Sequence, residues 1–182
     1  MDFELALNQI LYELKINDIE YGLVGGLALG ILGIDRATSD IDFLVQNSDK
    51  DLVRKIMLEL KYESIFHSIN FSLFQSPLKA LGEIDFIHPD TNTISEILSR
   101  KVNYSIFNDK IQINVVKADD LIILKLQAIK LDQTRKQKDE SDIISLISIY
   151  NNEIDKDKLI KFGKKLNMEN YILDLWKRIK NE

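Results

Sequence analysis

The chain of 182 residues contains no cysteine, two histidines and two prolines. The lack of cysteine excludes a disulfide framework, a cysteine-ligated zinc site and a thiol nucleophile, and it agrees with a reducing compartment. Two histidines, His67 and His88, are too few for a multi-histidine zinc site and disfavour a serine–histidine relay. Any active site is therefore expected to depend on carboxylates.

Long apolar segments are also missing. The longest apolar runs are shorter than the about 20 residues that span a bilayer as a helix, and no cationic leader followed by an apolar stretch opens the chain. We therefore expect a cytoplasmic protein with no membrane partner. The net charge of -5 argues against a general polyanion binder, although a local basic surface can coexist with it.

The hydrophobic pattern predicts a mixed α/β half followed by a helical half. In the first half we predict helices over residues 2–16, 27–32 and 49–60, the last capped at Ser48, and strands over 21–24, 41–45, 62–66, 70–75, 81–87, 102–107 and 111–116. In the second half we predict helices over 118–131, 138–150, 156–166 and 169–180. We expect residues 1–116 to form a catalytic core and 117–182 a helical region packed on it as one compact unit.

Glycine is scarce except in one short segment, because five of the seven glycines fall between Gly22 and Gly33. Gly25 and Gly26 end a predicted strand and open a predicted helix, where backbone N–H groups and the positive helix terminus favour phosphate. We therefore expect these two glycines to bind nucleotide. Arg36 and Ser39 follow closely and are expected to add phosphate contacts.

Acidic residues stand inside two of the predicted strands. Asp40 and Asp42 are two residues apart and so share one face of a strand, where two like charges repel each other. A divalent cation removes that cost, and Mg²⁺ prefers oxygen ligands of this kind. Asp85, on another strand, is expected to complete a set of three metal ligands. Glu83 shares a face with Asp85, but we interpret it as a solvated acid beside the site.

Three features together, Gly25-Gly26, Asp40-Ile41-Asp42 and Asp85, resemble the nucleotidyltransferase superfamily over about residues 20–90. The resemblance implies a mixed β-sheet flanked by helices. It also implies Mg²⁺ or Mn²⁺ at the three aspartates and transfer of a nucleotidyl group from a nucleoside triphosphate such as ATP or GTP.

A later group of residues narrows the resemblance. Lys125, Ala128, Arg135, the pair Lys138-Asp139 and Asp142 are similar to the late motif of AbiEii-type nucleotidyltransferase toxins. That resemblance implies that Lys125 contacts nucleotide phosphate and that Asp139 is a base near the acceptor. It further implies RNA, such as the 3′ end of tRNA, as the acceptor, and a cognate antitoxin as a partner.

Two alternatives keep the same core. In the first alternative the enzyme acts on a different acceptor, which is a small hydroxylated molecule, as in antibiotic nucleotidyltransferases, or a protein side chain. In the second alternative the chain is a catalytically silent nucleotide-binding module that retains the fold.

Overall fold

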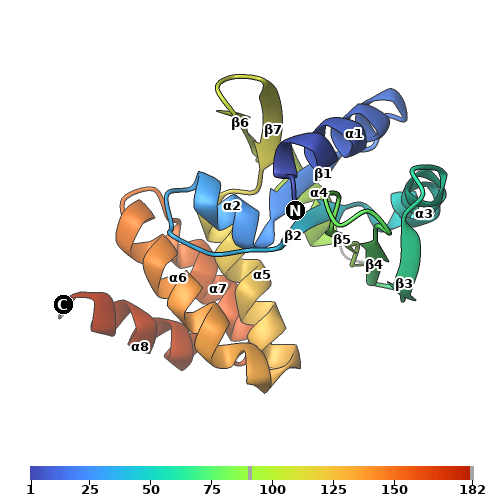
Figure 1. The fold of residues 1–182 in the computed structure, drawn as a ribbon. Coiled ribbons are helices and arrows are strands. Elements are labelled where there is room, and N and C mark those ends of the chain that lie inside the picture. The colour runs from blue at the N-terminus through green and yellow to red at the C-terminus, as the bar shows by residue number, and fades with distance from the viewer. Residues whose placement is uncertain (90–91, 181–182) are drawn as a thin grey trace. The chain divides into compact units, whose positions relative to one another are not determined.

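The structure is a computed structural model that describes residues 1–89 and 92–180 (Figure 1). It divides into two compact units, Met1–Val116 and Lys117–Glu182. We call them the core unit and the helical unit and describe each by itself.

A seven-stranded mixed sheet forms the centre of the core unit. Its strands are β1 Tyr21–Val24, β2 Asp40–Val45, β3 Glu63–His67, β4 Phe71–Gln75, β5 Glu83–Ile87, β6 Val102–Ile106 and β7 Ile111–Val115. Their order is β3-β4-β5-β2-β1-β7-β6. β2 runs parallel to β5 and β1 runs parallel to β7, whereas the other neighbours are antiparallel. The predicted α/β class is thus confirmed.

Residue alternation gives β2 two different faces. Ile41 and Phe43 are fully buried, and the Phe43 ring stacks on Phe86 of β5 at 5.4 Å between centroids. The intervening Asp40 and Asp42 are half-buried. One face of the strand pair therefore packs in the core, and the other presents acids.

Four α-helices accompany the sheet in the part of the core unit that the structure describes. They are α1 Phe3–Ile16, α2 Gly25–Ile31, α3 Lys50–Glu59 and α4 Asn92–Ser99. Asp2 caps α1, since its carboxylate accepts a hydrogen bond from the Leu5 N–H at 3.0 Å. α4 was not predicted.

The predicted cap of α3 is wrong. A 3₁₀ turn, Asn47–Asp49, precedes the helix, so the N-cap position falls on Asp49. The Ser48 hydroxyl instead donates to the Asp49 carboxylate at 3.3 Å. A serine that lies inside a tight turn cannot also reach the free N–H groups of the helix that follows.

The helical unit contains α5 Ala118–Leu131, a 3₁₀ turn Gln133–Arg135, α6 Lys136–Tyr150, α7 Lys156–Leu166 and α8 Glu169–Lys180. Its apolar side chains at helical spacing are buried, among them Leu126, Ile129, Ile143, Leu146, Leu159, Ile172 and Trp176. The predicted helices are present, although α6 begins two residues earlier than expected. In the described chain no helix is long and apolar enough to cross a membrane.

Candidate functional site

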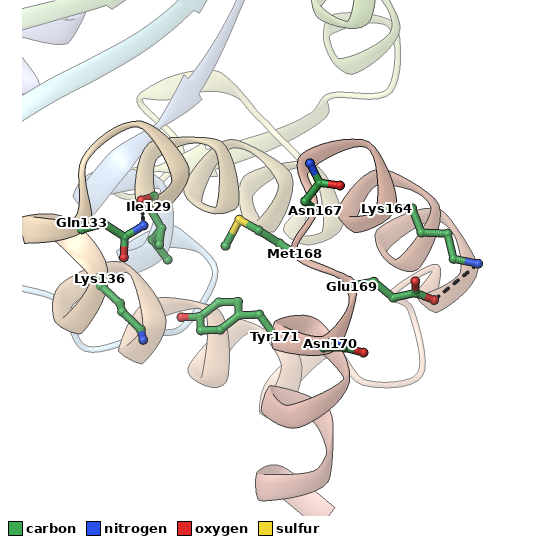
Figure 2. A pocket seen from close by; sticks show the side chains of 9 residues that line it. All are labelled: Ile129, Gln133, Lys136, Lys164, Asn167, Met168, Glu169, Asn170 and Tyr171. Carbon is green, nitrogen blue, oxygen red and sulfur yellow. Dashed lines mark hydrogen bonds and ion pairs between the residues drawn. The ribbon is translucent and has the colours of Figure 1, made fainter.

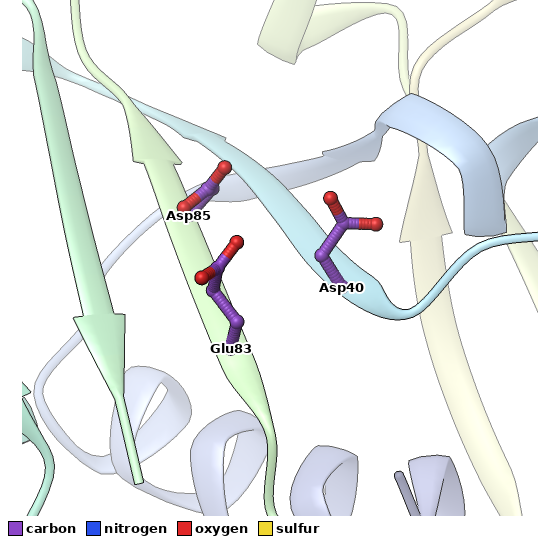
Figure 3. A group of neighbouring side chains, drawn as sticks. All are labelled: Asp40, Glu83 and Asp85. Carbon is purple, nitrogen blue, oxygen red and sulfur yellow. The ribbon is translucent and has the colours of Figure 1, made fainter.

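Pairing of β2 with β5 brings four carboxylates together on one face of the sheet. In the parallel register Asp40 lies beside Glu83, and Asp42 lies beside Asp85. Paired residues of neighbouring strands project to the same side. Asp40, Glu83 and Asp85 each have an oxygen within 4.8 Å of the other two (Figure 3).

Asp85 is the most buried of these acids, with 9% of its surface exposed. Its Oδ1 atom is buried and accepts no hydrogen bond from the residues that the structure describes. Burial, followed by the charges of Asp42, Glu83 and Asp40, raises the pKa of Asp85 to about 7. A buried oxygen without a donor among repelling carboxylates fits a divalent cation, which prefers such oxygen ligands.

Gly25 gives the Asp42 carboxylate its position. The glycine has φ +68°, and a Cβ atom there would lie 1.8 Å from Oδ2 of Asp42. The carboxylate therefore occupies the space that any other residue at position 25 would fill. Positive φ is also the conformation that favours glycine.

Gly26 has a similar relation to Thr38. A Cβ atom at Gly26 would lie 2.5 Å from the Thr38 hydroxyl. That hydroxyl donates a 2.5 Å hydrogen bond to Oδ1 of Asp40, and so it holds one acid of the cluster in place. The two glycines thus let the carboxylate of Asp42 and the hydroxyl of Thr38 approach the start of α2 closely.

Arg36 and Ser39 lie in the segment between α2 and β2, directly before Asp40. Arg36 is half-buried and Ser39 is exposed. The chain therefore places both residues next to the start of the strand that carries the acid pair.

Lys125 and Asp139 belong to the helical unit, where they pair with each other. Lys125 donates to Asp139 at 2.9 Å and to Asp142 at 2.6 Å, and Arg135 donates to Asp139 at 3.0 Å. Burial raises the pKa of Asp139, but Lys125 and Arg135 outweigh it, so the net shift is downward. Asp139 is fully buried, and its lowered pKa makes its carboxylate a weak base at neutral pH.

The helical unit also has a pocket of about 480 Å³ next to the start of α8 (Figure 2). Lys136, Lys164 and Glu169 supply its charged groups. The Lys136 ammonium lies 5.3 Å from the centre of the Tyr171 ring, and Lys164 pairs with Glu169 at 3.4 Å. A lining with two lysines and one acid suits a neutral or anionic group better than a polycation.

No protein-family model and no curated protein matches this chain. Solved structures do match it. The solution structure of the antibiotic-resistance factor ANT(2'')-Ia is 13% identical, with a TM-score of 0.65 over 98% of this chain and 99% of that one. A crystal structure of ANT(2'')-Ia in complex with adenylyl-2''-tobramycin is 12% identical, with a TM-score of 0.64 over 88% and 94%.

A third match is the lincomycin-bound lincosamide antibiotic adenylyltransferase LnuA. It is 16% identical, with a TM-score of 0.53 over 80% of this chain and 97% of that one. These likenesses show that the chain has the nucleotidyltransferase fold, as predicted.

Two residues of the site were missed or undervalued in the sequence. Glu83 lies inside the acidic cluster, and Thr38 orients Asp40. The alternation of Glu83 with Asp85 was visible, but the register that sets Glu83 beside Asp40 joins segments about 40 residues apart. No sequence signal marked Thr38.

Proposed function

We propose that this protein is a metal-dependent nucleotidyltransferase, which moves a nucleoside monophosphate group from a nucleoside triphosphate to an acceptor hydroxyl. One observation carries the proposal. Asp40, Asp42, Glu83 and Asp85 gather on one face of β2 and β5, and the most buried of them has an oxygen without a hydrogen-bond donor in the described chain. The nucleotidyltransferase fold gives this cluster its chemical context.

In the proposed reaction the acceptor oxygen forms a bond to the α-phosphorus. The bond from that phosphorus to the bridging oxygen breaks, pyrophosphate leaves with the electron pair, and the acceptor proton passes to solvent. A bound Mg²⁺ or Mn²⁺ would stabilise the charge that develops on the phosphate oxygens. Asp40, Asp42 and Asp85 would hold it, while Gly25, Gly26, Arg36 and Ser39 would contact the phosphates.

For the acceptor we favour a small hydroxylated molecule. ANT(2'')-Ia, a structure that matches nearly the whole chain, has been captured with adenylylated tobramycin, and LnuA with lincomycin. We therefore propose that the acceptor hydroxyl belongs to a small molecule.

RNA is the second candidate acceptor, in the manner of an AbiEii-type toxin with an antitoxin partner. The late motif from Lys125 to Asp142 supports it, and residues 117–182 carry 14 basic against 12 acidic side chains within an acidic chain. The ion pairs of Lys125 with Asp139 and Asp142 weigh against a phosphate contact by that lysine. For this reason we place RNA second.

The test uses purified protein, Mg²⁺ and each α-labelled nucleoside triphosphate, first with a panel of neutral, anionic and cationic hydroxylated small molecules and then with total RNA. We expect label in a small molecule with the wild type and none with Asp42→Asn. Label in tRNA would move the acceptor to RNA. Nucleotide binding without transfer to any acceptor would favour a silent module and would contradict the proposal.

A further inference from the structure

Glu83 lies in the acidic cluster between β2 and β5, close enough to the neighbouring acids to share a cation with them. It pairs in register with Asp40 across the β2–β5 ladder, and its carboxylate lies within 4.8 Å of both Asp40 and Asp85 (Figure 3). We propose that Glu83 is a direct ligand of the divalent cation, together with Asp40 and Asp85. The inference rests on the proposed function for the nature of the bound group.

A buried oxygen of Asp85 that accepts no hydrogen bond in the described chain is a second, independent indication that the cluster binds a cation. Oδ1 of Asp85 is buried, and in the described chain nothing donates a hydrogen bond to it. A carboxylate removed from water and from donors is destabilising as an anion unless it takes up a proton or a cation faces it. The charged groups described around it, Asp42, Glu83 and Asp40, are acids themselves, so they supply no such charge.

Asp42 is placed differently from the other three acids. Its Oδ2 atom fills the space beside Gly25, at the junction of β1 and α2. Asp40, Glu83 and Asp85 form a group in which each contributes an oxygen that lies within 4.8 Å of the other two. We therefore expect Glu83 to be a ligand of the cation in the nucleotide-free protein, beside the acids already assigned to it.

Thr38 adds to the same arrangement. Its hydroxyl donates a hydrogen bond to Oδ1 of Asp40 at 2.5 Å, which restrains the orientation of that carboxylate within the cluster. The side chain of Glu83 is one methylene longer than an aspartate. Its carboxylate therefore reaches further from the backbone of β5 than that of an aspartate at this position would.

The experiment measures binding of Mn²⁺ alone, without nucleotide, by electron paramagnetic resonance and calorimetry. The variants are Glu83→Gln, Glu83→Asp, Asp42→Asn and a matched control, Glu63→Gln. Glu63 is an exposed acid that pairs with Gln75, which in turn pairs with Glu83, so the control removes the same charge two strands away. Circular dichroism and the melting temperature verify that each variant folds.

We expect Glu83→Gln to weaken Mn²⁺ binding by about ten-fold or more, and Glu63→Gln by less than about two-fold. Glu83→Asp keeps the charge but shortens the side chain, so a ligand at this position predicts a clear loss with this variant too. Asp42→Asn removes another charge that acts on Asp85, so it should weaken binding as well. Equal effects of Glu83→Gln and Glu63→Gln, unchanged affinity in Glu83→Asp, or no Mn²⁺ binding by the wild type would overturn the inference.

The readout separates this inference from the proposed function. If Mn²⁺ binding depends on Glu83 but no nucleotidyl transfer occurs, the metal site stands and the proposed reaction fails. If transfer occurs and Mn²⁺ affinity is indifferent to Glu83, the reaction stands and Glu83 is not a ligand.

Discussion

Glycine at position 25 is required for two reasons: the carboxylate of Asp42 lies where a side chain would begin, and the backbone has a positive φ. We predict that Gly25→Ala destabilises the core unit by about 2 kcal/mol or more, because it combines overpacking with left-handed strain. The added Cβ would overlap Oδ2 of Asp42, and alanine would have to adopt the φ of +68° that Gly25 has. Thermal and urea unfolding of the full chain measure the loss.

Gly30→Ala is the matched control, since it lies in the same helix α2 and a Cβ there meets nothing within 4 Å. It should leave stability unchanged or raise it by up to about 1 kcal/mol. Equal destabilisation by the two changes would contradict the role assigned to Asp42 at Gly25.

Thr38 is expected to orient Asp40 for catalysis. We predict that Thr38→Val lowers kcat by roughly ten- to hundred-fold, because a hydrogen bond to a charged group contributes about 1.5–3 kcal/mol. Thr38→Ser retains the hydroxyl that donates to Asp40 and should retain most activity. Steady-state kinetics of nucleotidyl transfer compare the two variants, and similar losses in both would exclude the hydrogen bond as the cause.

At the residue scale, only some of the residues of the candidate site could be predicted from the sequence. Alternation within a strand predicted that Asp40 and Asp42 share a face, and the structure places both next to the strand that carries Asp85. The companions Glu83 and Thr38 depend on pairing between β2 and β5 and on the path of the segment before β2. Such long-range register is a property of the folded sheet and leaves no local pattern.

At the element scale, Lys125 joins α5 to α6 through two buried carboxylates. Its side chain is 12% exposed, and those of Asp139 and Asp142 are 0% and 6% exposed. We predict that Lys125→Met destabilises the helical unit by about 3–5 kcal/mol, because loss of the ammonium group removes the main counter-charge of two buried acids. Urea unfolding measures this loss.

The triple change Lys125→Met, Asp139→Asn and Asp142→Asn should recover much of that stability, since it removes the uncompensated charge together with its partner. The KM for nucleoside triphosphate, measured on folded protein, gives an independent readout. A stable Lys125→Met protein with a raised KM would instead support the phosphate contact that the toxin-type motif implies.

Most elements were predictable from their hydrophobic pattern, and the helix α4 was not. The helices of the second half and the seven strands were expected within a few residues of where they lie. The short helix α4 was missed, although its Ile94, Ile97 and Leu98 are buried at helical spacing. About two turns of periodicity after Pro89 do not distinguish a helix from a loop.

At the scale of the whole molecule, buried acids of the two units are expected to contribute to the pH dependence of stability in opposite directions. In the helical unit burial raises the pKa of Asp139 and Glu140, but ion pairs and hydrogen bonds outweigh it, so both are lowered. Their contribution to stability is present above the unfolded values near 4 and is lost as pH falls through the folded values. In the core unit the pKa of Asp85 is shifted in the opposite direction, upward.

The pKa of Asp85 rises from 3.8 to about 7 on folding, chiefly through burial. Between these values the folded protein holds a proton that the unfolded chain releases, so this contribution is present below pH 3.8 and is lost as pH rises through about 7. His88, whose pKa burial lowers, contributes in the opposite sense, because it loses stability as pH falls below 6.5. A comparison with Asp85→Asn isolates the aspartate from the histidine.

We therefore predict that Asp85→Asn inactivates transfer yet stabilises the metal-free protein, with a difference in Tm that is small at pH 4 and grows up to about pH 8. Added Mg²⁺ should raise the Tm of the wild type and narrow this difference, since the cation supplies the charge that buried Asp85 lacks. Differential scanning calorimetry with EDTA and with Mg²⁺, at a series of pH values, measures both effects. A difference in Tm that does not change with pH would mean that burial does not raise the pKa of Asp85. A Tm of the wild type that does not change with Mg²⁺ would mean that the cluster holds no cation. In either case stability and activity would no longer oppose each other at this residue.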